Sequence, residues 1–443
     1  MDGDQQGDYD LRDEASYDRL RLSQWLSGRA RGDGVSRRDL LRFFGGAGLA
    51  VAGLPLLAGR GVLSAAARSG PVPAVGQAAA SGPIVKPLPP EWFYVYGSNA
   101  EMRWEVMRGK GYLVPAGNFF VRDHTSTPLI DASTWSLKVF GTGLAGSPSA
   151  SSPLVFSYED LLRMPATSVT AFIECAGNGR SFFASQQGET VTGTQWLLGA
   201  IGVAEWRGVR LATVLDRAGL TPAAVDVMPY GLDPDYVTGG VDYGAVRRPI
   251  PVAKALDDVI LAYEMNGRPL LPDSGFPVRF IVPSWAGISS TKWVGQIEVS
   301  GTPLFSYWNT QAYRLFGPSY PSGGTPITRQ VVKSAFELEW NAQLAAGQPY
   351  LLTGRSWSGN GRIAHTEIST DGGVNWRRAI PRDRGAASAW QLWKFPWRPP
   401  SPGSYTLQAR ATDVTGATQP ATVPSNMLGY LFGAIVQHPV SAS

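Results

Sequence analysis

Hydrophobic and polar residues follow two different periods along the chain, which predict a mixture of strands and helices between Trp92 and about Ser300. A period of two residues, or a short continuous apolar run, predicts a buried strand. A period near 3.6 residues predicts an amphipathic helix. We expect strands at 135–141, 168–175, 257–267, 276–283 and 292–301, and helices at 157–165 and 211–220. Because helices and strands do not alternate regularly, the predicted fold class is α+β.

The two predicted helices carry recognisable end signals. Ser157 precedes the first helix and can accept a hydrogen bond from a free backbone N–H, while Pro165 stands just past its end. Gly219 closes the second helix, where a left-handed conformation is common.

A Pro/Gly/Ser/Tyr-rich connector at 301–328 separates this mixed region from a segment that reads as strands throughout. Asp371-Gly372-Gly373 stands between two alternating stretches and predicts a hairpin. The strands are expected within 350–359, 362–380, 389–397 and 403–416. Several short strands with turn signals between them predict a β-sandwich at 325–440.

The amino-terminal 90 residues have a different composition. Arg37 and Arg38 precede a Gly/Ala-rich apolar stretch, in a pattern that resembles a twin-arginine export signal at 1–68. Glycines and Pro55 interrupt the stretch, so a membrane anchor is the weaker alternative. A Pro/Gly/Ala-rich linker is expected at 69–90, with no further membrane span and a location in the periplasm or outside the cell.

Bulk composition excludes several classes of protein. With 44% hydrophobic and 17% charged residues, the 443-residue chain is neither disordered nor fibrous. A net charge of +4 without a basic cluster gives no reason to expect a nucleic-acid partner. One cysteine excludes an intramolecular disulfide.

That cysteine, Cys175, ends the apolar run 168–175 and begins the turn "AGNGR". A lone cysteine at the end of a strand is often just a small buried hydrophobic residue. The turn favours a chemical role, because its glycines let a ligand approach the backbone and Arg180 supplies a charge that favours a thiolate. Such a thiolate acts either as a nucleophile or as a ligand to a soft metal.

Arg122 and His124 lie two residues apart where an apolar segment turns polar. On an extended segment they share one face, so together they predict an anion site. An ion pair between Arg122 and Asp123 is the alternative interpretation. His124 is also the one histidine of this region that could serve a cysteine nucleophile as its base.

Five long motifs stand in this order along the chain: "FFVRDH", "ECAGNGR", "TGTQWLLGAIGVAEWRG", "DDVILAYEMNGRPLLPDSGFPVRFIVPSWAG" and "TKWVGQIEVS". Together they resemble the sulfite oxidase family of molybdopterin enzymes. The segment beginning "GRSWSGNGRIAHTEISTDGGVNW" is similar to that family's immunoglobulin-like dimerisation domain. The resemblance implies a mixed α/β catalytic domain at 91–310, a dimerisation domain at 325–440, and a cofactor of molybdenum held by a single molybdopterin.

The resemblance also implies roles for single residues. Cys175 stands where the family's cysteine binds molybdenum, and Tyr263 matches a tyrosine whose hydroxyl reaches the active site. Arg122 and Arg180 match arginines that hold the substrate oxyanion, with His124 and Trp196 beside them. The implied cofactor contacts are Cys175, His124, Asn178, Ser290 and Lys292.

The chain departs from the family pattern at two positions. Gly179 replaces an arginine of the usual turn motif. Thr353 stands where animal members bring a third substrate arginine, and Arg355 nearby would point the other way on an alternating strand. Fewer cations imply weaker sulfite binding or a less charged substrate.

The resemblance further implies a homodimer that oxidises sulfite, a small oxyanion, to sulfate. The chain has no Cys-x-x-Cys-His haem motif, so a separate electron acceptor such as a c-type cytochrome is expected. Two alternatives stay open at this point. One is a reductase of nitrate or a sulfoxide on the same cofactor, and the other is an exported binding protein without enzymatic activity.

Overall fold

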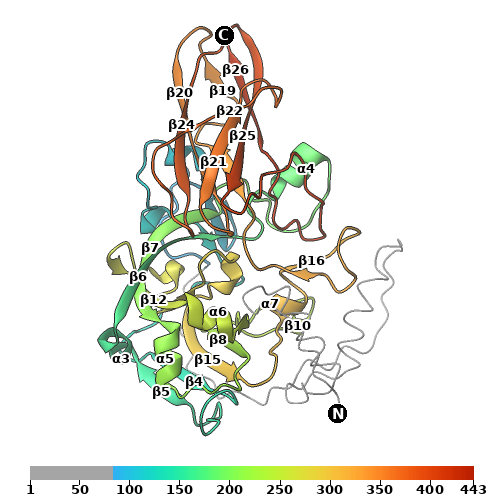
Figure 1. Ribbon diagram of the computed structural model, residues 1–443. Coiled ribbons are helices and arrows are strands. Elements are labelled where there is room, and N and C mark those ends of the chain that lie inside the picture. Colours follow the sequence, from blue (N-terminus) through green and yellow to red (C-terminus); the bar gives the residue numbers. More distant parts are fainter. Residues whose placement is uncertain (1–82) are drawn as a thin grey trace.

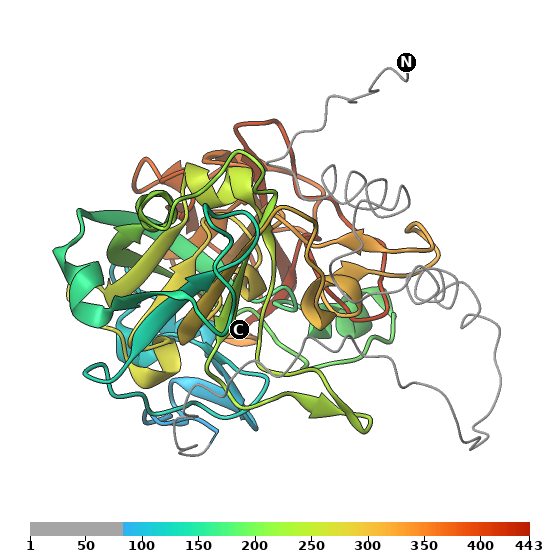
Figure 2. The same cartoon turned by 90° about the horizontal axis from the view of Figure 1, so that it is seen from below.

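A computed structural model describes residues 83–443, which form two regions stacked along one axis (Figure 1). We call the region built on β1–β15 the mixed region and the region built on β18–β26 the sandwich. Figure 2, seen from below Figure 1, shows the mixed region in front of the sandwich. The predicted export signal and most of the predicted linker lie outside the described residues. Within residues 83–443, no helix has the length and apolar character needed to cross a membrane.

Two five-stranded sheets form the centre of the mixed region. In the first sheet, β7 pairs antiparallel with β6 on one side and β12 on the other. Its strands are β6 (Ala166–Glu174), β7 (Ile201–Arg210), β12 (Ile260–Met265), β13 (Arg268–Pro269) and β14 (Arg279–Ile281). This sheet matters most for the site, because β6 ends directly before Cys175.

The second sheet has the order β11-β8-β15-β4-β5, with one parallel pair between β15 and β4. Its strands are β4 (Ser136–Phe140), β5 (Leu154–Ser157), β8 (Asp226–Gly231), β11 (Ile250–Pro251) and β15 (Val294–Ser300). Apolar side chains of both sheets and of helices α3 (Tyr158–Arg163), α5 (Leu211–Arg217) and α6 (Val252–Asp257) form one core. A separate three-stranded sheet comprises β1 (Phe93–Tyr96), β2 (Asn99–Met102) and β3 (Val121–Arg122).

The sandwich consists of a four-stranded and a five-stranded sheet. The first contains β18 (Lys333–Phe336), β20 (Tyr350–Trp357), β23 (Ile380–Pro381) and β24 (Gln391–Trp397). The second contains β19 (Ala342–Leu344), β21 (Ile363–Ser369), β22 (Arg377–Arg378), β25 (Gly403–Asp413) and β26 (Gln437–Ala442). A core of large aromatic and aliphatic side chains lies between them.

The fold class α+β is confirmed, and each predicted strand and helix corresponds to an observed one. The Ser157 hydroxyl accepts a hydrogen bond from the Asp160 amide at 3.1 Å, and the Asp160 carboxylate accepts one from the Ser157 amide at 2.9 Å. This reciprocal capping box fixes the start of α3.

Two segments predicted to be connectors are more ordered than expected. Residues 83–90, the end of the predicted linker, pack Ile84 and Leu88 against the core shared by both regions. The segment 301–328 contains α7 (Tyr307–Thr310) and the pair β16 (Arg314–Leu315) and β17 (Thr325–Pro326). Both segments contribute to the site described next.

The remaining elements are short. Helix α4 (Ser181–Gln187) follows the Cys175 turn, and a two-stranded hairpin, β9 (Val237–Thr238) and β10 (Val241–Asp242), follows β8.

Candidate active site

Cys175 stands at the point where β6 gives way to a tight turn. The Cys175 amide donates to the Ala200 carbonyl at 2.9 Å, and the Cys175 carbonyl accepts from the Asn178 amide at 2.9 Å. The Cys175 Sγ atom accepts a weak hydrogen bond from the Gly177 amide at 3.4 Å. The side chain is free and almost completely buried, yet it lines a cavity.

This cavity, together with the solvent at its mouth, encloses about 750 Å³. Its wall contains charged groups of both signs, hydroxyls and one thiol. The residues with such groups are Arg122, Asp123, His124, Cys175, Asp233, Asp273, Ser274, Arg279, Ser290, Thr291, Lys292 and Tyr313. The structure therefore brings together five predicted residues, Cys175, Arg122, His124, Ser290 and Lys292.

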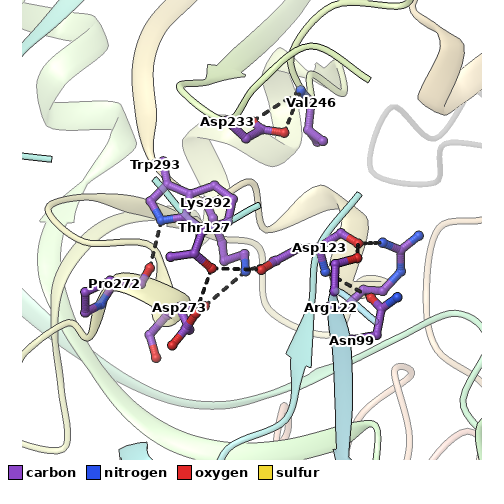
Figure 3. Close-up of polar contacts among 12 residues, drawn as sticks. Asn99, Arg122, Asp123, Thr127, Asp233, Val246, Pro272, Asp273, Lys292 and Trp293 are labelled. Carbon is purple, nitrogen blue, oxygen red and sulfur yellow. Dashed lines mark hydrogen bonds and ion pairs between the residues drawn. The ribbon is translucent and has the colours of Figure 1, made fainter. Parts of the chain in front are cut away.

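A buried network joins the charged groups of one wall (Figure 3). Lys292 Nζ pairs with the Asp123 carboxylate and donates to the Asp273 carbonyl at 3.0 Å. The Thr127 hydroxyl lies 2.6 Å from Asp273 Oδ1 and 3.1 Å from Asp123 Oδ2. Burial lowers the pKa of Lys292 and raises the pKa of Asp123, and the charge of each opposes the shift in the other.

Arg122 extends from β3 and donates from Nη1 to the Asp123 carbonyl at 2.5 Å. Asp123 pairs with Lys292, so the alternative of an Arg122–Asp123 side-chain ion pair is not what the structure shows. Burial acts to lower the pKa of Arg122, but the nearby Tyr313 and Cys175 outweigh it and raise the pKa. Arg122 is thus a permanently charged group in the cavity wall.

His124 is held in a neutral form. Burial, with the positive charges of Arg122 and Lys292, places its pKa well below the usual value. The indole N–H of Trp308 can only donate, and it lies 3.2 Å from His124 Nε2. Nε2 therefore accepts, and the ring proton belongs on Nδ1.

Tyr313 is a cavity residue that the sequence analysis missed. Its hydroxyl lies 3.3 Å from the same His124 nitrogen, and its ring stacks on Tyr430 with centroids 5.3 Å apart. Since Trp308 already donates to that nitrogen, the Tyr313 hydroxyl keeps proton-donating capacity toward the cavity. Burial raises the pKa of Tyr313, so the hydroxyl stays protonated.

Arg279 and Asp233 were also missed. Arg279 donates from Nη1 and Nη2 to the carbonyls of Ser274 and Ser290, both at 3.0 Å, and burial lowers its pKa to about 9. Burial raises the pKa of Asp233 to about 7, although it accepts from the Val246 amide at 3.3 Å. A charged residue inside the apolar run "FPVRFIVP" was the available signal for Arg279.

Arg180 lies beside the cavity rather than in its wall. Its Nε donates to the Leu428 carbonyl at 2.8 Å and its Nη1 to the Thr194 carbonyl at 2.6 Å. A Cβ at Gly177 would stand 2.5 Å from Nη2, so only glycine lets the turn pack on this guanidinium. Burial lowers the pKa of Arg180, while Cys175 opposes the shift. Arg180 thus supplies a positive charge beside Cys175, and its direct contact with a substrate stays a prediction.

The prediction for Tyr263 is wrong. Tyr263 occupies an irregularity in the pairing of β12 with β7, between Ala262 and Glu264. Its side chain is buried in the other core, edge-to-face with Tyr158 at 6.4 Å, and does not line the cavity.

Trp196 and Asn178 do not line the cavity. The Trp196 ring is fully buried and packs edge-to-face on Tyr96 at 5.6 Å, away from the cavity wall. Asn178 uses its side-chain amide internally: Nδ2 donates to Glu174 Oε1 at 2.9 Å and Oδ1 accepts from the Ala200 amide at 3.1 Å. The Asn178 amide is thus occupied by protein contacts. The Trp196 indole nitrogen is buried without a hydrogen-bond partner, and its contact with a substrate stays a prediction.

The departures from the family pattern have local explanations. Gly179 adopts φ +87°, and a Cβ there would stand 3.2 Å from Phe432. Arg355 is buried against Glu337, with Nε 2.5 Å from Oε1, and is absent from the cavity wall. Thr353 does not line the cavity either. The position of the family's third arginine therefore provides no cation to the site, and Arg355 does not replace it.

The wall fits a group that brings metal donors of its own. Within residues 83–443, no cluster of three or more His, Cys, Asp or Glu side chains could hold a metal, so Cys175 could supply only one ligand. Two buried polar atoms of wall residues, Arg279 Nε and Thr291 Oγ1, have no hydrogen-bond partner. A thiol, unpaired donors and three cations suit an anionic, oxygen-rich cofactor that carries a soft metal.

Comparison with known proteins agrees with this chemistry. The family described as "Oxidoreductase molybdopterin binding domain" matches residues 124–308, and "Mo-co oxidoreductase dimerisation domain" matches residues 327–438. Human mitochondrial sulfite oxidase is 35% identical over 360 residues, covering 76% of this chain and 63% of that protein. Chicken sulfite oxidase is 33% identical over 344 residues, covering 73% of this chain and 72% of that protein. This chain thus spans less than two thirds of the length of the human protein.

Among solved structures, the sulfane dehydrogenase SoxCD from Paracoccus pantotrophus superposes with a TM-score of 0.65 at 28% identity. The match covers 79% of this chain and 84% of the other.

Proposed function

Because this chain belongs to the sulfite oxidase family of molybdopterin oxidoreductases, we propose that it oxidises sulfite to sulfate and passes the electrons to a separate acceptor. The observation that carries the proposal is that the Cys175 thiol and the Arg122 guanidinium line one cavity. When bound, the molybdenum–molybdopterin group supplies the two-electron redox chemistry. The net reaction converts sulfite and water to sulfate, two protons and two electrons.

The residues of the chain bind and orient the reactants. Cys175 is the proposed metal ligand. Lys292, Arg279 and Ser290 line the same cavity and would hold the anionic pterin. Arg122 binds the oxyanion through charge-assisted hydrogen bonds. Tyr313 donates its hydroxyl proton to a substrate oxygen, because the Trp308 indole already donates to the neighbouring His124 nitrogen.

The missing third arginine supports a second candidate, oxidation of a sulfur substrate with less charge than sulfite. Neither Thr353 nor Arg355 lines the cavity. The cation that we assign to substrate binding is therefore Arg122, at the end of β3. The similarity to a sulfane dehydrogenase supports the same candidate.

A substrate panel tests both candidates. Protein purified from a molybdopterin-producing host is assayed with sulfite or thiosulfate and ferricyanide, and with nitrate or methionine sulfoxide and reduced viologen. We expect turnover of sulfite and none in the reductive direction. Thiosulfate turnover without sulfite turnover would favour the second candidate, and reduction of nitrate or sulfoxide alone would contradict both.

Substitution of Arg122 tests the proposed anion contact. Arg122→Gln should raise KM for sulfite about tenfold, because a hydrogen bond to a charged group is lost. The matched control is Arg163→Gln, since Arg163 is exposed on α3 and forms ion pairs with the exposed Glu159 and Asp160. An unchanged KM in Arg122→Gln would place the anion elsewhere.

Further proposals concern the setting of the enzyme. We propose export by the twin-arginine route, a location in the periplasm or cell exterior, and a c-type cytochrome as acceptor, without a haem in this chain. The match to a dimerisation domain supports a homodimer, which the molar mass in solution would test.

A further inference from the structure

Three side chains of the carboxyl-terminal region hold the short segment that contains Cys175. Lys333 Nζ lies 2.8 Å from Glu174 Oε1 and donates to the Asn178 carbonyl at 2.9 Å. Trp357 Nε1 donates to Glu174 Oε2 at 2.9 Å, and Gln330 Nε2 donates to the Glu174 carbonyl at 2.8 Å. The segment is thus fixed immediately before Cys175 and three residues after it.

These contacts are shielded from water. The side chains of Glu174 and Lys333 are 0% and 6% exposed, and Trp357 is fully buried. Hydrogen bonds to a buried carboxylate are short and strongly directional, so they restrict motion more than surface contacts do. Glu174 and Trp357 are 183 residues apart in the sequence, which makes this a link between the two regions rather than local turn chemistry.

We infer that Lys333 and Trp357 are positioning residues that set the placement of the Cys175 sulfur through Glu174. The Cys175 backbone makes its own hydrogen bonds to Ala200 and Asn178, and the Asn178 carbonyl is in turn held by Lys333. Loss of either positioning contact lets the turn open locally and gives the sulfur more than one position. The inference rests on the proposed role of Cys175 as metal ligand, but its first test does not require the metal.

Cys175 is the sole cysteine, so its reaction with iodoacetamide reports the turn alone in cofactor-free protein. In Trp357→Phe we expect the alkylation rate to rise about tenfold, because a hydrogen bond to a charged group no longer opposes opening. The matched control is Trp393→Phe: Trp393 is equally buried in the sandwich, and its indole nitrogen has no hydrogen-bond partner. Equal alkylation rates for folded Trp357→Phe and the control would overturn the inference.

Lys333 needs a double substitution, because Lys333→Met alone leaves the Glu174 charge buried and unpaired, which endangers folding. Glu174→Gln/Lys333→Met removes both charges at similar volume. We expect this variant to fold and to alkylate faster than wild type, since the Asn178 carbonyl has lost its donor. Wild-type alkylation in the folded double variant would show that Lys333 is merely structural.

The loaded enzyme supplies a second readout. Electron paramagnetic resonance of Mo(V) is expected to show shifted or heterogeneous signals in Trp357→Phe, with kcat reduced more than KM, and wild-type signals in Trp393→Phe. Wild-type signals in both would contradict the inference. Faster alkylation in Trp357→Phe combined with an unchanged number of sulfur ligands to molybdenum in Cys175→Ser would instead reject the metal-ligand role and leave the positioning contact standing.

Discussion

Tyr313 and Tyr263 are both buried tyrosines, and their surroundings decide which can take part in chemistry. The Tyr313 hydroxyl lies by His124 in the cavity, whereas Tyr263 packs on Tyr158 in the opposite core. Tyr313→Phe should lower kcat/KM for sulfite about a hundredfold, as expected for loss of a positioned proton donor. Tyr263→Phe also removes a hydroxyl group, but one that lies outside the cavity, and should change kcat/KM little. Steady-state kinetics would contradict this assignment if the two variants showed the opposite order.

Asp233 makes stability depend on pH. Burial raises its pKa to about 7 in the folded chain, so the folded protein holds a proton that the unfolded chain releases near pH 3.9. Its stabilising contribution is therefore present at low pH and is lost as the pH rises toward 7. Relative to Asp233→Asn, the free energy of unfolding of cofactor-free protein should fall by about 1.4 kcal/mol per pH unit across that interval. Denaturant titrations at several pH values measure it, and a constant difference would refute it.

Sequence motifs predicted part of the site and missed the rest for physical reasons. Cys175, Arg122 and His124 sit in short segments whose chemistry is visible locally. Tyr313 belongs to a connector that has no periodic pattern, so its approach to His124 depends on tertiary folding. Tyr263 was assigned to the site by its match to a family motif, and a motif match does not show to which core the irregular pairing of β12 directs the side chain.

At the scale of elements, β7 shows where pattern-based prediction fails. This strand of ten residues lies between β6 and β12, yet glycines interrupt its pattern and it was not predicted. The glycines are required by close packing. A Cβ at Gly202 would stand 2.4 Å from the Phe119 ring, and one at Gly208 would stand 1.9 Å from the Leu261 carbonyl oxygen. Residues that weaken a strand in isolation thus permit the contacts on both sides of it.

The segment 83–88 supports Asp273, a residue of the cavity wall. The amides of Val85 and Lys86 donate to the Asp273 carboxylate at 3.0 and 2.7 Å, and the Asp273 carbonyl accepts from Lys292. Deletion of residues 1–88 should lower the free energy of unfolding by about 3 kcal/mol, because two hydrogen bonds to a carboxylate are lost. Deletion of residues 1–82 is the matched control and keeps these contacts. Equal stability of the two cofactor-free proteins in denaturant would contradict this.

At the scale of the whole molecule, the order of a mixed region followed by a sandwich was predictable, but their shared core was not. Phe172, Cys175 and Trp196 belong to the same cluster of buried residues as Trp357 and Phe432 of the later region. The hydrophobic pattern along the chain does not reveal contacts between such distant segments. The sandwich is consequently part of the site's support as well as a candidate for dimer contacts.

The central claim is that the Cys175 sulfur binds molybdenum. X-ray absorption at the molybdenum edge measures the sulfur ligands of the metal directly, in wild type and in Cys175→Ser loaded in the same host. The account predicts one fewer sulfur at the metal in Cys175→Ser, together with loss of sulfite oxidation. An unchanged sulfur count in that variant, or wild-type protein that binds no molybdenum, would contradict it.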